Sequence, residues 1–286
     1  MQGGSLSDWL FSLSVPATAV GTILVMLTGA GIGRLVRRAQ MRKAQREEKE
    51  SEPSVAQEGY LLAGALGLLG LLLAFSFGMV LNRYEARREL VTTEANAIGT
   101  AYLRSQLLDE PYRTRLSKLL IAYTENRINL ASSGGTDSPY VATNDHMLTE
   151  IWATVKASRE SALAHGLTTA LLMTFNEVID LDTERKVAWE LRVPVEVIFL
   201  LLAYLAVTAA VVGHQVDGPR GRRAAFLLFG MVGLSVAVIT DLNRPMTGHS
   251  RESQKAMLML LASLKAQPPQ VFDQVDSSSS VAGRQQ

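Results

Sequence analysis

Apolar residues in this chain gather in four long runs, each without a charged residue, and the intervening segments are polar. The runs contain 25, 22, 17 and 17 residues and cover Trp9–Gly33, Tyr60–Leu81, Val197–Gly213 and Ala224–Thr240. A helix needs about 20 apolar residues to cross a bilayer, and about 17 is the lower limit. The pattern therefore predicts four transmembrane helices arranged as two hairpins. A cleaved secretory signal is the alternative for the first run, but no Lys or Arg precedes that run.

The 110 residues between the two hairpins, 83–192, carry 13 basic and 15 acidic side chains, so they are expected to be solvated. Apolar residues recur there at helical spacing, which predicts buried helix faces. One such face is Val91, Ala95, Ile98 and Tyr102; a second, after Pro111, is Leu116, Leu120 and Tyr123. A turn is expected at 132–139, followed by helices over 148–164 and 167–191.

We expect an all-α polytopic membrane protein, because no segment has a useful β period. A short helix is predicted over Ser250–Lys265, and a disordered tail from Gln267. The predicted divisions are a first transmembrane hairpin, a soluble helical domain, a second transmembrane hairpin, a soluble helix and the tail, at 1–82, 83–192, 193–247, 248–266 and 267–286.

The composition excludes several classes of function. Charged residues make up only 19% of the chain and the net charge is +1, so a nucleic-acid partner is not expected. With no Cys and four His, neither a metal site nor a cofactor is expected. Four carboxylates could in principle serve acid–base catalysis, but we expect them on solvated helix faces and predict no enzyme: Glu94, Asp180, Asp182 and Glu184.

Gly29 and Gly33 lie within a glycine pattern that superficially resembles a nucleotide-binding loop. The pattern sits inside an apolar helix and does not follow a strand, so we reject that interpretation. Small residues four apart let helices approach closely in lipid, and this spacing favours helix packing.

The second apolar run carries a stripe of alternating small and bulky residues at helical spacing: Gly64, Gly67, Leu71, Phe75, Gly78 and Asn82. One interpretation is a seam between packed helices. The other is that several copies face a common axis, where Leu71 and Phe75 form apolar constrictions that gate ions by dewetting. Arg83, Arg87 and Arg88 follow, where interfacial anchoring is the ordinary role of basic residues. In the pore interpretation, the residues at the pore mouth or in selectivity are Gly64, Gly78, Asn82, Arg83 and Arg87.

Three charged residues at the ends of the second hairpin have two possible roles. Glu196 stands in the first turn of the third span, where it suits the positive end of the helix dipole. Asp241 and Arg244 are three apart and can pair across the last turn of the fourth span. Helix capping and closure are the default roles; gating, or coupling of a pore to the soluble helices, is the functional alternative.

The sequence from Leu71 to Tyr84, continued by 85–88 and 94–104, resembles the bestrophin-like domain of bacterial membrane proteins and, more distantly, bestrophins. Val193-Pro194 and the segment Asp241–Pro245 are similar to the helix start and the Asn-Pro helix end of bestrophins. The likeness covers roughly residues 60–104 and 190–246. It implies a homopentameric ion channel with a cytosolic helical region, and it places the pore neck at Gly67, Leu71 and Phe75.

The chain departs from bestrophins at two places. Residues 246–252 replace the acidic cluster that binds calcium, so calcium gating is not supported. Gly67 and Leu71 stand where larger side chains are expected in animal relatives, which puts the constriction at Gly67 in doubt.

The charge of the loops and the family resemblance predict opposite orientations in the membrane. Both hairpin loops are rich in Lys and Arg, and this charge bias predicts that the loops lie in the cytoplasm. Bestrophin topology places them outside and the termini in the cytoplasm. We follow the resemblance, because a central segment of this size suits a cytosolic vestibule, and we expect a multi-pass protein of the bacterial inner membrane.

Taken together, the sequence predicts an oligomeric, passive ion channel. Its partners are the lipid bilayer, copies of the same chain and inorganic ions. The sign of the permeant ion stays open, because Arg83, Arg87 and Arg88 favour anions while Glu85 and Glu89 lie beside them. The alternative function is a membrane-anchored helical sensor or scaffold without conductance.

Overall fold

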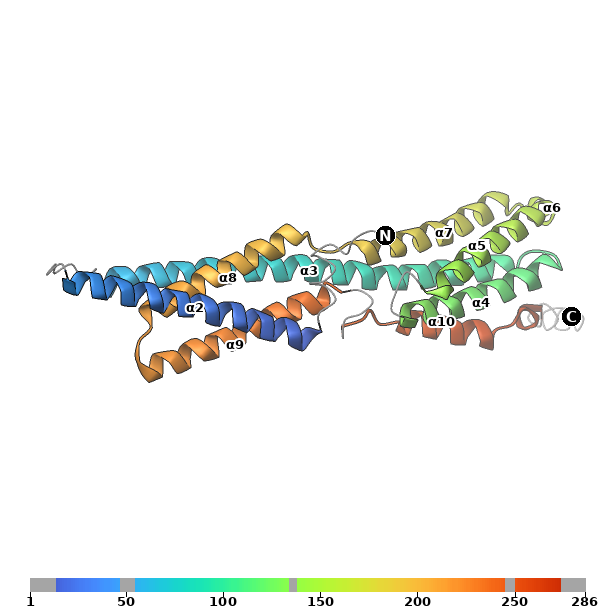
Figure 1. Ribbon diagram of the computed structural model, residues 1–286. Helices are drawn as coiled ribbons and strands as arrows, with labels where there is room; N and C mark the ends of the chain where they lie inside the picture. Colours follow the sequence, from blue (N-terminus) through green and yellow to red (C-terminus); the bar gives the residue numbers. More distant parts are fainter. Residues whose placement is uncertain (1–13, 47–54, 134–137, 245–249, 274–286) are drawn as a thin grey trace, which may run out of the picture. The chain divides into compact units, whose positions relative to one another are not determined.

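The computed structural model describes residues 14–46, 55–133, 138–244 and 250–273, and the elements in these ranges are helices (Figure 1). They are, in chain order, α2 (Val15–Arg46), α3 (Val55–Ser105), α4 (Tyr112–Ser133), α5 (Pro139–Ala157), α6 (Arg159–Ala164), α7 (Thr168–Glu190), α8 (Val195–Gln215), α9 (Gly218–Leu242) and α10 (Lys255–Ala266). No strand is present in the described ranges, so the expected all-α class is confirmed.

The chain divides into two compact units. Unit 1 contains α2, α3 as far as Arg83, α8 and α9. Unit 2 contains α3 from Tyr84 onward, α4 to α7 and α10.

Among the described residues, four helical stretches are long and apolar enough to cross a membrane: Val15–Lys43, Gly59–Ser105, Thr168–Gln215 and Gly218–Leu242. They contain the last three predicted spans and residues 15–33 of the first, and the chain is a polytopic membrane protein. Residues 9–13 of the first predicted run lie outside the described residues. Within unit 1, the main packing partners of α2 are α8 and α9.

The contact between α2 and α8 is close enough to bring backbone against backbone. A Cβ atom on Gly29 would lie 2.6 Å from the carbonyl oxygen of Ala206, and one on Gly33 would collide with the carbonyl of Ala210. From the other side, a Cβ on Gly213 of α8 would collide with the backbone of Ala30. The packing interpretation of the glycine pattern is confirmed.

Helix α3 is one continuous helix of 51 residues, whereas the sequence pattern predicts a span ending at Leu81 and a separate helix from Glu89. The two predicted pieces join because the connecting residues 82–88 contain neither Gly nor Pro. They include Glu85, Ala86, Arg87 and Arg88, residue types with high helix propensity.

The core of unit 2 is built from the two predicted helix faces. Val91, Ala95, Ile98 and Tyr102 of α3 are all buried, as are Leu116, Leu120 and Tyr123 of α4. They pack with apolar side chains of α5, α7 and α10, including Ile151, Phe175 and Met257. Both faces are confirmed.

The C-terminal part of unit 2 differs from the prediction in two respects. Helix α10 begins at Lys255, five residues later than predicted. Residues 267–273, expected to be disordered, are ordered: the Tyr102 hydroxyl donates to the Gln267 carbonyl at 2.7 Å, Phe272 packs against the core, and Asp273 pairs with Arg113. These contacts fix the segment. Residues 274–286 lie outside the described residues.

Candidate functional site

The stripe on α3 lies on the exposed side of that helix within unit 1. Leu71 is 67% exposed and Phe75 is 64% exposed. The opposite side of α3 carries the buried residues Leu69 and Val80. They pack against apolar residues from the rest of unit 1. Two large apolar side chains of the stripe therefore have no cover within the described protomer.

The small members of the stripe border open space. A Cβ atom added at Gly64, Gly67 or Gly78 would meet no atom within 4 Å. Asn82 is also exposed. The exposed side is wider than the stripe, since Leu61 and Leu68 are 65% and 55% exposed. Another surface can therefore approach the backbone of α3 closely at the glycines.

The two arginines expected at a pore mouth have different surroundings. Arg83, in unit 1, is half-buried. Arg87, in unit 2, is 3% exposed, and its Nε donates to Oε1 of Glu252 at 2.8 Å. The guanidinium of Arg87 is therefore committed to a carboxylate inside the protomer.

The end of α9 brings two of the three predicted coupling residues together. Asp241 and Arg244 are both buried, and an oxygen of the Asp241 carboxylate accepts from the Ser250 backbone N–H at 3.0 Å. Burial lowers the pKa of the Arg244 guanidinium, and the nearby Asp241 carboxylate opposes that shift. Glu196 is exposed in the first turn of α8, and no hydrogen bond or ion pair joins it to Asp241 or Arg244 in the described ranges.

Asn243, one residue before Arg244, has a role that the sequence interpretation missed. Its Oδ1 accepts from the backbone N–H of Val193 at 2.9 Å, and both residues are buried. This bond ties the segment before α8 to the end of α9. A polar residue just after an apolar span was the available signal.

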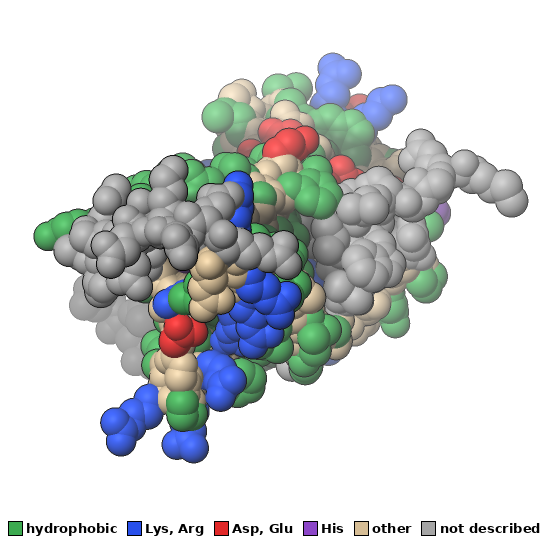
Figure 2. All heavy atoms as spheres, turned by 60° about the vertical axis from the view of Figure 1, so that its left-hand side comes forward, with side chains coloured by type: hydrophobic (Ala, Val, Ile, Leu, Met, Phe, Trp, Pro, Cys, Tyr) green, Lys and Arg blue, Asp and Glu red, His purple; other side chains and the backbone are tan. Residues whose placement is uncertain are grey.

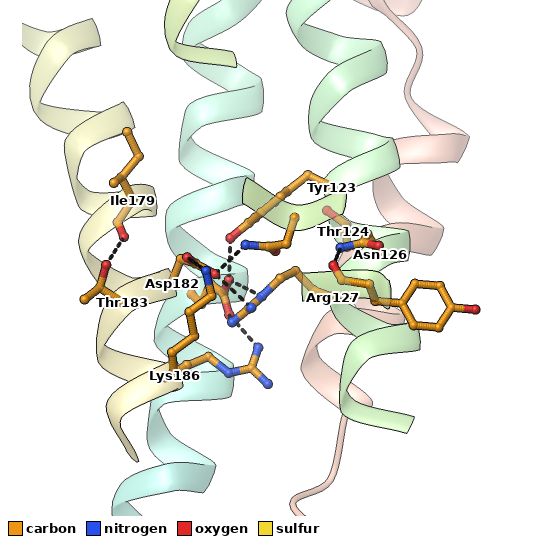
Figure 3. Close-up of polar contacts among 12 residues, drawn as sticks. Tyr123, Thr124, Asn126, Arg127, Ile179, Asp182, Thr183 and Lys186 are labelled. Atoms are coloured by element: carbon orange, nitrogen blue, oxygen red, sulfur yellow. Dashed lines mark hydrogen bonds and ion pairs between the residues drawn. The ribbon is translucent and has the colours of Figure 1, made fainter. Parts of the chain in front are cut away.

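A cluster of charged residues lies buried in unit 2, between α3, α4, α5 and α7 (Figure 3). At its centre is the Glu94 carboxylate, with both oxygens paired. Nε of Arg127 lies 2.8 Å from Oε1, and Nη2 donates to Oε2 at 3.1 Å. Arg185 of α7 donates to Oε2, and the Tyr123 hydroxyl donates to Oε1 at 3.0 Å.

Asp182 of α7 is the second acidic residue of the cluster. Its Oδ1 accepts from Nη1 of Arg127 and from Nδ2 of Asn144, each at 2.9 Å. Its Oδ2 lies 2.7 Å from Nζ of Lys186, which also donates to Asp145 at 2.6 Å. The ring of Trp189 lies 5.4 Å from the guanidinium carbons of Arg127 and Arg185. Figure 3 shows Tyr123, Arg127, Asp182 and Lys186 converging.

Burial and opposite charge together set the ionisation of this cluster. Burial, reinforced by the Glu94 carboxylate, raises the pKa of Tyr123 well above its usual value. Burial alone would lower the pKa of Arg127, but Glu94 overrides it and the net shift is upward. At the rim, the hydrogen bond from Lys186 lowers the pKa of Asp145. The Tyr123 hydroxyl therefore stays protonated beside the Glu94 carboxylate, and the contacts of the cluster hold four helices together.

The cluster corrects one expectation. Glu94 and Asp182, predicted on solvated faces, are 0% and 2% exposed. Asp180 and Glu184 are exposed, as expected. A buried carboxylate is stable only when it is paired, and the arginines supply the pairing.

Basic side chains gather on the end of unit 1 that Figure 2 brings forward. In unit 1, Nη1 of Arg37 in α2 donates to the His214 carbonyl at 2.8 Å and pairs with Asp217 at 2.9 Å. Lys and Arg at a membrane–water boundary anchor spans. In the described ranges, no group of three or more His, Asp or Glu residues could hold a metal ion.

In the described part of the chain, helices without strands, four potential spans and a polar helical segment that follows the second span in sequence define a polytopic membrane protein. The profile of the Bestrophin-like domain family matches residues 24–257. The chain belongs to this Bestrophin-like domain family. No curated protein matches the sequence significantly.

Solved structures share the fold at low sequence identity. A single-residue variant of a bacterial bestrophin homologue from Klebsiella pneumoniae superposes with a TM-score of 0.64 at 14% identity, covering 89% of this chain and 99% of the homologue. The homologue phased with zinc gives a TM-score of 0.59 at 14% identity, with coverage of 86% and 98%. A variant described as a membrane protein gives 0.60 at 14% identity, with coverage of 85% and 97%. These likenesses define the fold.

Proposed function

We propose that the protein is an oligomeric, passive ion channel in which copies of α3 surround a pore and the stripe Gly64, Gly67, Leu71, Phe75, Gly78 and Asn82 faces the axis. The observation that carries this proposal is the exposure of Leu71 and Phe75 on a protomer whose α3 buries its opposite side. Membership of the Bestrophin-like domain family supports it.

The alternation of glycine with large apolar residues suits a pore better than a lipid-facing surface. Lipid chains would cover any apolar side chain, and they require no glycines. Glycines on an exposed helix side allow neighbouring helices to approach closely around an axis. Between them, the rings of Phe75 and the side chains of Leu71 would narrow the passage to an apolar neck that gates by dewetting. Gly67, with no side chain, would widen the neck on one side.

Selectivity would come from charges outside the neck, because the stripe carries none. Arg87 is paired with Glu252, so its charge is largely compensated within each protomer. Of the two arginines proposed at the mouth, Arg83 is then the one left to act there, and with the exposed Arg88 it would favour anions. Asp241 and Arg244 are proposed to couple the end of α9 to the neighbouring segment at Ser250; Glu196 is proposed to act at the start of α8.

We place the protein in the bacterial inner membrane as a homopentamer, with the termini and the central helices in the cytoplasm. The chain has no cysteine, so a Ser54→Cys variant and an Asn129→Cys variant each carry a unique thiol. A membrane-impermeant thiol reagent on intact spheroplasts is expected to label Cys at position 54 and to spare it at position 129. The reverse pattern would invert the topology.

The decisive experiment is recording from purified protein in planar bilayers. Replacing Phe75 by Ala should remove the apolar constriction and raise the current at a given voltage. Phe226→Ala is the matched control, because Phe226 on α9 is 60% exposed, similar to Phe75. Its removal should leave the current unchanged.

Particle mass separates the channel from the scaffold. Native mass spectrometry should give a particle of five 31.1-kDa chains. A monomer or dimer, with no current from the native protein or from Phe75→Ala, would support a membrane-anchored helical scaffold instead.

A further inference from the structure

A pocket of about 280 Å³ opens in unit 2 where α5, α6 and α7 meet. The end of α5, the short α6 and the start of α7 come together at one end of the unit (Figure 1). Pockets that bind small molecules have volumes of about 300–1,000 Å³. The volume therefore suits a molecule of one or two rings, and a nucleotide or a long-chain lipid would not fit within it.

The polar side chains that line the pocket are basic or neutral. Lys156 of α5 and Arg159 of α6 line it, both are exposed, and no acidic residue does so. Neither Lys156 nor Arg159 makes an ion pair with another described residue. Two cations without a carboxylate between them repel each other, and an anion placed between them would relieve that repulsion.

The remaining lining is apolar, with one unused polar atom. Val155 and Leu171 form a buried floor, and the Trp152 ring and Leu172 stand at the side, 38% and 40% exposed. The hydroxyl oxygen of Thr168 is buried and makes no hydrogen bond within the described ranges. An aromatic ring offers a stacking surface, and a buried hydroxyl needs a partner.

We propose that this pocket binds a small amphiphilic carboxylate, such as an aryl carboxylic acid. The carboxylate would lie between Lys156 and Arg159 and accept a hydrogen bond from the Thr168 hydroxyl. The apolar body would lie on Val155 and Leu171 beside Trp152. We expect the ligand to be an anion because charge-assisted hydrogen bonds from Lys and Arg favour an anion over a neutral molecule of equal shape. This site is independent of the proposed pore.

The test is isothermal titration of the full chain in lipid nanodiscs with 2-naphthoate, with empty nanodiscs as the blank. Saturable binding is expected for 2-naphthoate. The neutral analogue 2-naphthalenemethanol lacks the charge and acetate lacks the apolar body, so both should bind at least about tenfold more weakly.

Variants locate the binding. The double variant Lys156→Gln/Arg159→Gln should weaken 2-naphthoate binding at least about tenfold, and each single variant should show part of that loss. Trp152→Ala should also weaken it. Lys118→Gln is the matched control, because Lys118 is an exposed lysine on α4 away from the pocket, and it should bind as the native chain does.

Three results would overturn the proposal: no saturable binding of 2-naphthoate, equal affinity for the neutral analogue, or unchanged affinity in the double variant. If a second copy of the chain covered the pocket, 2-naphthoate would show no saturable binding. Thermal unfolding of each variant serves as the folding check, and both basic residues are exposed.

Discussion

Nε of Arg127 lies 2.8 Å from Oε1 of Glu94, and both side chains are 0% exposed. The contact joins α4 to α3 inside unit 2. Arg185 brings α7 to the same carboxylate, and Tyr123 adds a second bond from α4. Removing one member of a buried ion pair leaves its partner charged and without compensation, which is the costly outcome.

Glu94→Gln should therefore destabilise the protein strongly. The substitution keeps the shape of the side chain but leaves Arg127 and Arg185 without their shared anion. We expect the free energy of unfolding to fall by about 3–5 kcal/mol, measured by thermal or denaturant unfolding of the purified protein followed by circular dichroism.

Asp273→Asn is the control for this change. It breaks the ion pair of Asp273 with Arg113, in which the Asp273 side chain is 52% exposed. Solvent screens an exposed pair, so its loss should lower the free energy of unfolding much less than Glu94→Gln does. Equal losses of unfolding free energy in Glu94→Gln and Asp273→Asn would show that the buried cluster stabilises the fold no more than an exposed ion pair does.

We expect the protein to lose stability at alkaline pH because of the buried Tyr123. Its pKa is raised well above the usual value by burial and by Glu94, so the folded state holds the phenolic proton more tightly than the unfolded chain does. That stability is fully present below the unfolded pKa of about 10. It is lost as the pH rises from there toward the folded pKa.

Tyr123→Phe should separate the two contributions of the hydroxyl. At pH 8 the variant should be less stable by about 1 kcal/mol, because the bond to Glu94 is gone. Above pH 10 it should lose stability less steeply than the native chain. Equal slopes for the native chain and Tyr123→Phe, in unfolding measurements from pH 8 to 11, would contradict this assignment.

Gly33→Ala should weaken the contact between α2 and α8. The added Cβ would collide with the carbonyl of Ala210, and neither backbone can move aside independently. We expect the free energy of unfolding to fall by at least about 1–3 kcal/mol. The measurement is a lower melting temperature in detergent. Gly31→Ala adds the same methyl group on the same helix with nothing within 4 Å. It should be neutral or stabilising by up to about 1 kcal/mol, and a matching loss there would refute the packing argument.

The spans and the helix faces of unit 2 could be predicted because each rests on a local pattern. Long uncharged runs mark spans, and apolar residues at spacings of three and four mark buried faces. Val91, Ala95 and Ile98 illustrate the second pattern, and all three are buried.

The buried charges were missed because acidic residues were assumed to face solvent. The signal was their phase: Glu94 follows Val91 by three residues, and Arg127 follows Tyr123 by four. Both therefore continue a buried face. Which acid meets which base depends on packing between helices distant in sequence, and a single sequence does not encode that pairing locally.

The ordered segment 267–273 was missed for a related reason. Pro268 and Pro269 indicate a chain that leaves the helix, and such composition favours disorder. The segment is held instead by the distant partners Tyr102, which binds the Gln267 carbonyl, and Arg113, which binds Asp273.

The glycines that line the contact between α2 and α8 also limit how this pair of helices can evolve. Gly29 and Gly33 face Ala206 and Ala210, and Gly213 faces Ala30, so each position already holds one of the two smallest residues. Ordinarily a larger residue on one helix is tolerated when its neighbour shrinks. Where glycine meets backbone nothing remains to shrink, so no second-site suppressor on the opposing side chain should rescue an enlargement at Gly33.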